Sequence, residues 1–369
     1  MKICFLGDAA APHLRRWSRY FTDSGFDVHI ITFNHDILPH YEPAKVYLIK
    51  KTFAGATIFE RLFSAPLTIL KTYKLIKQIY PDILHCHDAG GYSWVGMLML
   101  FKPFVVSAWG SDILVHAKTS KVTRFLTALA LKKCNLIHCD GYQIQEEIIK
   151  LGVEKKKIRV IPFGTDTKKF VPDYKNKEKY KKNYDIKGKI IISTRTLSPI
   201  HNVETFVKAI PLVLENLPNA RFIITGGGCE FQRLQNLVNF LGVSDFVKFT
   251  GYIEESEMVK LLQVADIYVS TSLSESGLAA STAEAMSCAL PVINTDTGDI
   301  KNWIRDNENG FIVPVNDYQA LAEKIIFLIK QDEQLLEKIG VRNRGIIENR
   351  NNYYTEMAKM EDIYKGLQK

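Results

Sequence analysis

The sequence predicts an α/β protein made of two doubly wound domains, each with a parallel sheet. Short apolar segments typical of buried strands alternate with amphipathic segments typical of helices over residues 2–162, and a second alternation begins at residue 190. The Lys-rich residues 174–189 lie between the two and are typical of a linker. The chain of 369 residues also exceeds the length at which one hydrophobic core usually stops growing. We therefore expect an N-terminal domain of residues 1–170 and a C-terminal domain of residues 171–351.

The N-terminal domain opens with a pattern of strand, turn, helix and strand. Residues 3–6 are apolar, and the small residues Ala9 and Ala10 follow in a loop. A helix from about residue 13 to 22 then precedes a strand at residues 28–32. This order is typical of a Rossmann-type sheet, whose ligands bind near the first turn. The G-x-G-x-x-G fingerprint of dinucleotide-binding enzymes is missing from the turn, which argues against a dehydrogenase.

Three side chains follow the ends of later strands in this domain. His87 ends a strand, and Trp109 and Asp112 come directly after another. Active-site loops lie at the carboxyl ends of such strands, so we expect these residues near a ligand. His85 alternates with His87 as side chains do at a strand end, and no second ligand cluster supports a metal site. The remaining strands are expected at residues 136–138 and 158–162, and a helix at residues 142–151.

The second domain places an arginine and two glutamates around one loop. Arg195 follows an apolar strand that begins at residue 190. Residues 270–298 then follow the order strand, small-residue loop, helix and strand, with Glu275 in the loop and Glu284 in the helix. Small residues let the backbone approach a ligand, and the N–H groups that open a helix favour an anion such as a diphosphate. The other expected elements are strands at 221–225, 247–251 and 309–314, helices at 203–215, 230–241 and 318–330, and the turn Gly226–Gly228.

Composition and charge limit the class of protein. No uncharged apolar run reaches the length of a membrane span, and six scattered cysteines without a C-x-x-C pair indicate reduced thiols in a cytosolic protein. Residues 1–180 contain 27 Lys and Arg against 16 Asp and Glu, whereas residues 181–369 contain 21 against 24. A basic half indicates an anionic partner, either nucleic acid or a membrane surface. No aromatic and basic interleaving or known motif supports nucleic acid, so we expect none.

One segment of the basic half has two interpretations. Residues 53–80 form an apolar helical pattern that is interrupted at Pro66. The lysines in or just before it are Lys50, Lys51, Lys71, Lys74 and Lys77. The segment is either an amphipathic basic helix that lies on an anionic membrane, or an ordinary helix packed on the sheet with a solvated lysine face.

The stretch around Glu284 resembles the donor-binding signature of the retaining glycosyltransferases of family 4. In that family an acidic loop residue and a small-residue turn precede E-A-M and a strand rich in Pro, Val and Ile, as in Glu284-Ala285-Met286 and Leu290-Pro291-Val292-Ile293. The family has seven residues between its two glutamates, whereas eight separate Glu275 from Glu284, so either Glu275 or Ser276 fills the first acidic position. The resemblance covers nearly the whole chain. It implies the GT-B fold, with two Rossmann-like domains facing a central cleft and a last helix, about residues 352–369, that crosses back to the first domain.

The resemblance implies roles on the donor side. Arg195 matches an arginine that holds the donor diphosphate, and His201 stands where the family has a partner lysine. Glu284 would accept hydrogen bonds from the ribose, and Glu275 or the main chain of Ser276 would lie beside the sugar hydroxyls. The expected donor-binding residues are Arg195, His201, Gly226, Gly227, Glu275, Ser276, Gly277, Leu278, Ala279 and Glu284.

The resemblance also assigns residues to the acceptor side and to catalysis. Trp109 stands where many members have a histidine that touches the donor sugar. The expected acceptor-side residues are Ala9, Ala10, His13, His87 and Trp109, and the expected catalytic residues are Arg195, Glu275 and Asp112. The main catalytic task is to stabilise the charge that develops on the leaving diphosphate, and no D-x-D at a cleft position indicates a metal.

The resemblance, taken with the charge pattern, implies a retaining, metal-independent hexosyltransferase in the cytoplasm, in contact with the inner face of the membrane. A UDP- or GDP-sugar would be its substrate rather than a cofactor, and the acceptor would be a polysaccharide, a lipid-linked carbohydrate or a small molecule. Two alternatives stay open. A sugar-nucleotide 2-epimerase shares the GT-B fold, and a non-catalytic sugar-nucleotide-binding subunit would also fit, because the first glutamate, the lysine and the histidine of the family pattern are altered.

Overall fold

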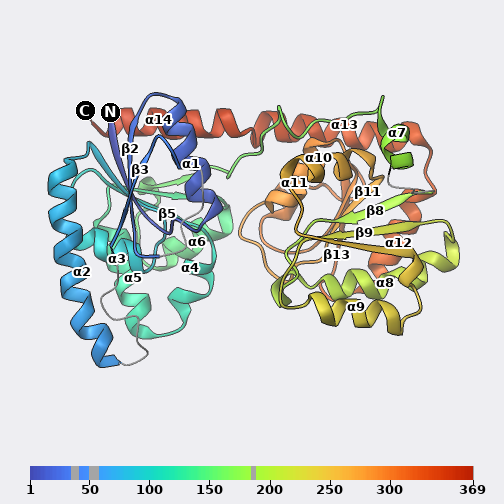
Figure 1. The fold of residues 1–369 in the computed structure, drawn as a ribbon, viewed down its shortest axis with the longest axis horizontal. Coiled ribbons are helices and arrows are strands. Elements are labelled where there is room, and N and C mark those ends of the chain that lie inside the picture. Colours follow the sequence, from blue (N-terminus) through green and yellow to red (C-terminus); the bar gives the residue numbers. More distant parts are fainter. Residues whose placement is uncertain (35–40, 50–57, 184–187, 369) are drawn as a thin grey trace. The chain divides into compact units, whose positions relative to one another are not determined.

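The computed structural model describes residues 1–34, 41–49, 58–183 and 188–368, with the backbone alone for residues 58–65 and 183. The chain forms two compact units (Figure 1). Unit 1 comprises Met1–Phe163 and Glu356–Lys369, and unit 2 comprises Gly164–Thr355. Each unit is a doubly wound α/β structure with helices on its parallel sheet, which confirms the predicted fold class.

Unit 1 contains, in the described part of the chain, a seven-stranded sheet in the order β3-β2-β1-β4-β5-β6-β7. Its strands are β1 (Lys2–Leu6), β2 (Asp27–Thr32), β3 (Lys45–Leu48), β4 (Ile83–Cys86), β5 (Phe104–Ala108), β6 (Leu136–Cys139) and β7 (Ile158–Val160). Its helices are α1 (Pro12–Asp23), α2 (Ile58–Ile79), α3 (Gly91–Leu98), α4 (Ser111–Leu114), α5 (Lys121–Lys133), α6 (Tyr142–Lys150) and most of α14 (Tyr353–Leu367). Most inner strands are buried along their whole length, as expected when helices cover both faces of a parallel sheet.

Unit 2 contains, among the described residues, a six-stranded sheet in the order β10-β9-β8-β11-β12-β13. Its strands are β8 (Ile190–Ser193), β9 (Arg221–Thr225), β10 (Val247–Gly251), β11 (Ile267–Ser270), β12 (Val292–Thr295) and β13 (Gly310–Val313). Its helices are α7 (Lys177–Asn183), α8 (Val203–Asn216), α9 (Phe231–Phe240), α10 (Glu255–Val264), α11 (Ala280–Ser287), α12 (Tyr318–Ile329) and α13 (Glu333–Arg350). All strand pairs described in both sheets are parallel.

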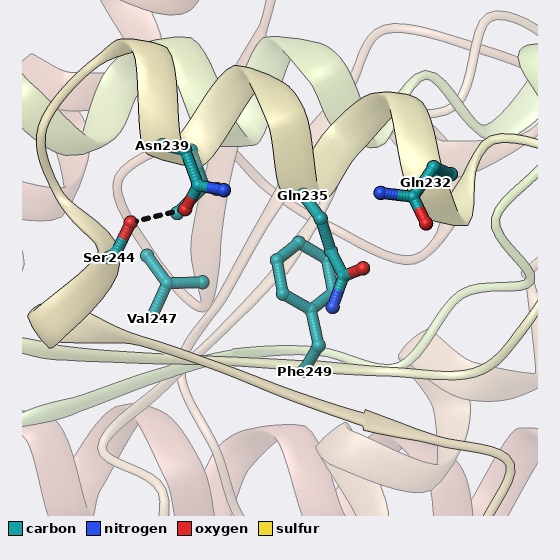
Figure 2. Close-up of a pocket in the computed structure, with 7 residues that line it drawn as sticks. Gln232, Gln235, Asn239, Ser244, Val247 and Phe249 are labelled. Carbon is teal, nitrogen blue, oxygen red and sulfur yellow. Dashed lines mark hydrogen bonds between the residues drawn. The ribbon is translucent and has the colours of Figure 1, made fainter.

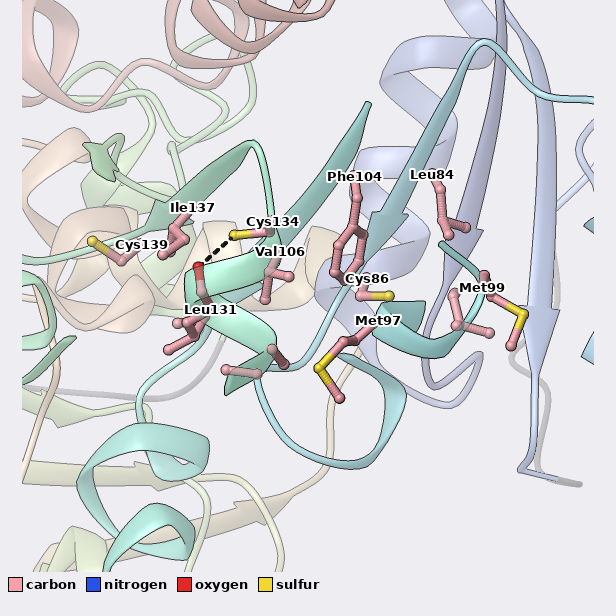
Figure 3. Packing of buried hydrophobic residues seen from close by; sticks show 14 of the residues in the cluster. Leu84, Cys86, Met97, Met99, Phe104, Val106, Leu131, Cys134, Ile137 and Cys139 are labelled. Carbon is pink, nitrogen blue, oxygen red and sulfur yellow. Dashed lines mark hydrogen bonds between the residues drawn. The ribbon is translucent and has the colours of Figure 1, made fainter. Parts of the chain in front are cut away.

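The core of unit 1 shows how closely a helix packs on this kind of sheet. Buried side chains from β4, β5 and β6 interdigitate with those of α3 and α5 (Figure 3). A Cβ atom at Gly96 of α3 would lie 2.4 Å from the sulfur of Cys86, so only glycine permits this approach. Burial raises the pKa of the Cys134 thiol in the same cluster to about 12, which leaves it protonated and unreactive.

Two sequence-based expectations about local structure are wrong. The apolar pattern expected to be interrupted at Pro66 forms one continuous helix, α2, with Pro66 inside it. The expected linker 174–189 contains α7, whose Lys177 Nζ lies 2.8 Å from the carboxylate of Asp266. Lys50 and Lys51 lie outside the described residues.

Candidate functional site

The strand order of unit 2 identifies one point of its sheet as a candidate ligand site. The order reverses between β8 and β11, so the loops that follow these two neighbouring strands leave in opposite directions. Ligands of open α/β sheets bind in the crevice that this reversal produces. Arg195 lies two residues after β8, and Glu275 lies in the loop after β11. The fold thus joins two residues that are 80 positions apart in the sequence.

Arg195 is the centre of this site. Its side chain is nearly buried, and its Nη1 donates to the Ser281 hydroxyl at 2.9 Å. Its Nη2 forms an ion pair with a carboxylate oxygen of Glu275 and a 2.8 Å hydrogen bond with Nδ1 of His201. Because an arginine nitrogen can only donate, Nδ1 of His201 is the acceptor, and the ring carries its proton on Nε2. Burial, reinforced by the Arg195 charge, lowers the pKa of His201 to about 4, so this imidazole is neutral at physiological pH.

Two polar partners of this cluster were missed by the sequence analysis. Ser281 accepts from Arg195 and also from the hydroxyl of Tyr268, at 2.8 Å. Tyr268 is fully buried in β11, and a buried tyrosine hydroxyl normally requires a hydrogen-bond partner. Because Tyr268 in β11 needs such a partner, the sequence predicts a polar residue close to it. This signal could have identified Ser281 in the helix that follows β11.

The glycine turn after β9 supports the loop that carries Arg195. A Cβ atom at Gly226 would lie 2.6 Å from the Arg195 carbonyl oxygen, and the φ angle of Gly226 is +101°. A Cβ atom at Gly227 would lie 2.4 Å from the ring of Tyr252. The amide of Leu197 also donates to the carbonyl of Gly227 at 2.9 Å. A side chain at Gly226 would therefore displace the Arg195 loop, whereas one at Gly227 would displace the ring of Tyr252.

The small-residue loop leads into a helix whose first turn has no side-chain cap. Ala279 is the N-cap residue of α11, and its side chain makes no capping hydrogen bond. Uncapped N–H groups and the helix dipole together favour an anion at this end. Ser276 and Leu278 in the loop are partly exposed, whereas Gly277 is buried. Glu284 lies one turn into α11 and is partly exposed.

A second set of predicted residues meets at the corresponding reversal in unit 1, between β1 and β4. The ring centroids of His13 and Trp109 are 4.4 Å apart, and those of His87 and Trp109 are 5.8 Å apart. Both ring nitrogens of His87 and Nε1 of Trp109 are buried, with no hydrogen-bond partner in the described part of the chain. Burial lowers the pKa of His13 to about 4. The three rings form an uncharged aromatic wall.

Asp112 holds the loop that carries Trp109. Its buried carboxylate accepts backbone N–H groups from Ala89 at 2.9 Å, Gly110 at 3.0 Å and Ile113 at 2.9 Å, and that of Trp109 at 3.2 Å. Burial raises the pKa of Asp112 to about 6 in spite of these bonds. This geometry is that of a positioning residue, and the predicted catalytic role of Asp112 stays a prediction.

The loop after β1 is fixed by local hydrogen bonds. The amide of Ala9 donates to the Thr32 hydroxyl at 3.2 Å, and its carbonyl accepts from the Tyr41 hydroxyl at 3.0 Å. The amide of Ala10 donates to the Asp8 carboxylate at 2.9 Å. These contacts place the backbone of both alanines beside the start of α1, where His13 lies.

A separate cavity of about 300 Å³ lies between α9 and the edge strand β10 (Figure 2). Gln235 lies over the ring of Phe249, and the Ser244 hydroxyl donates to the Asn239 side chain at 2.6 Å. The cavity contains none of the residues that the sequence analysis singled out.

Known protein families match both units. Residues 175–345 match the family described as Glycosyl transferases group 1, and residues 2–141 match the family described as Glycosyl transferase 4-like. The chain is similar to UDP-Gal:alpha-D-GlcNAc-diphosphoundecaprenol alpha-1,3-galactosyltransferase of Escherichia coli, at 25% identity over 80% of this chain and 78% of the relative. It is also similar to N-acetyl-alpha-D-glucosaminyl L-malate synthase of Bacillus anthracis, at 23% identity over 94% of this chain and 91% of the relative. The crystal structure of Anabaena Alr3699/HepE in complex with UDP has the same fold, with a TM-score of 0.84 and 20% identity over 100% of both chains.

Proposed function

Because the chain belongs to the glycosyl transferases group 1, a family of GT-B glycosyltransferases that use nucleotide sugars, we propose that it uses a UDP- or GDP-sugar and retains the anomeric configuration. One observation carries the assignment of the donor site. Arg195, His201, Glu275 and Ser281 converge at the reversal of the unit 2 sheet, beside the uncapped start of α11. A guanidinium and the N–H groups that open a helix are suited to a diphosphate.

In this proposal the donor side works mainly by charge stabilisation. When the bond between the anomeric carbon and the phosphate oxygen breaks, the diphosphate gains negative charge. Arg195 and the first N–H groups of α11 would stabilise that charge, which is the largest single term in many such reactions. The acceptor hydroxyl attacks the face from which the diphosphate leaves, and the departing phosphate oxygen takes the hydroxyl proton. No side chain is then needed as nucleophile or base.

The proposed contacts to the rest of the donor follow the family pattern. Glu284 on α11 would accept from the ribose hydroxyls, and Glu275 would face the sugar once it is released from Arg195. Gly226 and Gly227 would act by supporting the Arg195 loop, Gly226 through its lack of a side chain and Gly227 through its carbonyl, which accepts from the amide of Leu197. These roles predict that substitution of the side chains impairs donor binding without unfolding unit 2.

The proposed acceptor region is the aromatic wall of unit 1. His13 and Trp109 present ring surfaces, and His87 has unpaired buried nitrogens in the described structure. Aromatic faces and uncharged hydrogen-bonding groups suit a sugar ring better than an ionised acceptor. The relative that acts on a diphosphoundecaprenol-linked sugar supports a lipid-linked carbohydrate acceptor, whereas the L-malate synthase supports a small soluble one.

We also propose that unit 1 contacts an anionic membrane peripherally. No described helix is long and apolar enough to cross a bilayer. The described half of α2 buries Ile76 and Ile79 and exposes Leu67, Leu70 and Tyr73, at 38%, 49% and 39%. Its lysines at positions 71, 74 and 77, here called the basic face of α2, are also exposed. Exposed apolar side chains among lysines favour the membrane interpretation over a simply solvated face.

Incubation with labelled nucleotide sugars tests the proposed function. The wild-type protein is offered UDP- and GDP-sugars with a lipid-linked or a soluble acceptor, and the anomeric configuration of the product is determined by NMR. We expect transfer with retention from one nucleotide class. Inversion would contradict the proposed mechanism, epimerisation of the sugar would indicate the 2-epimerase, and binding without transfer would indicate a non-catalytic subunit.

A further inference from the structure

The hydrogen bonds of Arg195 leave no pair of adjacent donors free. The guanidinium has five N–H groups in a fixed plane, and two of them are on Nη2. Nη2 is bonded to the Glu275 carboxylate and to Nδ1 of His201, and Nη1 is bonded to Ser281. Nε of Arg195 is buried and has no partner among the described residues.

This arrangement conflicts with bidentate binding of an oxyanion. A phosphate group binds a guanidinium through two parallel N–H bonds, either from Nε and Nη2 or from Nη1 and Nη2. Both pairs of nitrogens include Nη2. The two hydrogens of Nη2 are already bonded to Glu275 and to His201. A diphosphate can therefore engage Arg195 fully only if one of these partners leaves.

We propose that Glu275 occupies the diphosphate position of Arg195 in the free protein and is displaced when the donor binds. The inference rests on the proposed donor site and adds its regulation. Glu275 is the partner that must move, because its negative charge would lie directly beside the incoming diphosphate. His201 is neutral and can stay, since its Nδ1 only accepts from Arg195 and its pKa is held low by burial.

The backbone around Glu275 allows a side-chain rotation rather than a loop movement. Gly298 packs against the main chain of Glu275, where a Cβ atom would lie 2.4 Å from the Glu275 carbonyl oxygen. The side chain of Glu275 is 20% exposed, whereas that of Arg195 is 9% exposed. The main chain of Glu275 is thus in close contact, and its carboxylate has access to solvent. Rotation about the side-chain bonds would release it from Arg195 toward the place proposed for the donor sugar.

This role predicts opposite effects on diphosphate affinity and on sugar transfer. Glu275→Gln keeps the shape of the side chain but removes the charge that competes for Arg195. We expect inorganic pyrophosphate and the matching nucleoside diphosphate to bind about three- to tenfold more tightly, and sugar transfer to slow by at least about tenfold. If Glu275 were only a donor contact, the substitution would weaken or leave unchanged the affinity for pyrophosphate.

Isothermal titration of the full chain with pyrophosphate, UDP and GDP at low salt decides between these outcomes. Glu308→Gln is the matched control, because Glu308 forms an ion pair with Arg342 elsewhere on unit 2 and should leave both quantities unchanged. Glu275→Ala is measured as well, so that a folding defect of one variant does not decide the result. If the wild-type protein binds pyrophosphate and both Glu275 variants bind it equally or more weakly, the proposed displacement of Glu275 is wrong. The proposed donor site is not contradicted by that result. Failure of the wild-type protein to bind all three probes overturns the proposed donor site itself.

Discussion

Unit 1 contains a chain of buried hydrogen bonds that runs in one direction and ties the C-terminal helix to the sheet. Nε2 of His138 lies 2.9 Å from the carbonyl oxygen of Ile161, which can only accept, so Nε2 carries the proton. Nδ1 of His138 must then accept from the Ser107 hydroxyl at 2.9 Å, and Ser107 accepts from Nε2 of His85 at 2.8 Å. Nδ1 of His85 finally accepts from the hydroxyl of Tyr364 on α14. Every member of the chain is fixed in one tautomer or rotamer by its neighbours.

Tyr364→Phe removes the first donor of this chain. The substitution keeps the ring, which is fully buried, and leaves Nδ1 of His85 without a partner. A buried acceptor that has lost its hydrogen-bond partner lowers the free energy of unfolding by about 1–3 kcal/mol. For a unit of this size each kcal/mol lowers the melting temperature by about 2–4 °C, so we expect a decrease of roughly 2–12 °C. Ser107→Ala breaks two bonds at the middle of the chain and should cost more.

Calorimetry and hydrogen exchange of α14 measure this effect. Tyr354→Phe is the matched control, because the Tyr354 hydroxyl lies 3.4 Å from the Asp166 carboxylate at an exposed position and its loss should change stability by less than about 0.5 kcal/mol. Equal melting temperatures for Tyr364→Phe and Tyr354→Phe would refute the argument, as would α14 amides that exchange no faster than in the wild type.

The same series of buried hydrogen bonds predicts how the stability of unit 1 depends on pH. Burial lowers the pKa of His138 to about 4 and that of His85 well below its ordinary value of 6.5. The unfolded state therefore binds protons that the folded state does not, and stability is full above pH 6.5 and falls as the pH drops toward 4. For His138 alone the loss is on the order of 3 kcal/mol. Melting temperatures that stay constant between pH 7 and pH 4.5 would contradict this assignment of protonation.

Three further predictions concern the donor site, metal and membrane. Arg195→Ala and Glu284→Ala should each weaken use of the nucleotide sugar by roughly 1.5–3 kcal/mol without unfolding unit 2, and unchanged apparent affinity in both would reject the site. Transfer should persist in EDTA, and a complete loss that Mg²⁺ or Mn²⁺ restores would show that the reaction requires a metal. Lys→Ser at the three positions of the basic face of α2 should abolish low-salt sedimentation with anionic vesicles, since each lysine near such a surface contributes on the order of 1 kcal/mol, whereas Lys→Arg should preserve it. Equal sedimentation of wild type and the Ser variant would contradict membrane contact.

Much of the fold could be predicted because helices cover both faces of each sheet. Strands of that kind, such as β4 or β11, appear in the sequence as short continuous apolar runs, and turn residues mark their ends. Two of the elements that the sequence analysis did not predict carry weak local signals. β3 is four residues long and partly exposed, and α7 is a short lysine-rich helix stabilised by Asp266 from a distant part of the chain. Contacts between residues this far apart leave no local pattern.

The candidate site was predictable where strand ends determine it. The end of β8 places Arg195, and the following βαβ unit places Glu275, so both residues could be named from the order of elements alone. Their ion pair could not be predicted, because it depends on side-chain directions across two loops. The hydrogen bonds of Asp112 could not be predicted either, because its carboxylate accepts four backbone N–H groups from two separate segments of the chain.

In the proposed donor site, where the family pattern has a lysine at the position of His201, the positive charge would be concentrated on Arg195. His201 accepts from Arg195 and is neutral, so it cannot share the charge of a diphosphate as a lysine would. Glu275 further offsets the charge of Arg195 in the free protein. If Glu275 is displaced as proposed, the cost of its displacement would lower the affinity for the diphosphate, including the diphosphate that remains after transfer. A carboxylate that returns to Arg195 would therefore favour release of that product, which is often the slow step in enzymes of this kind.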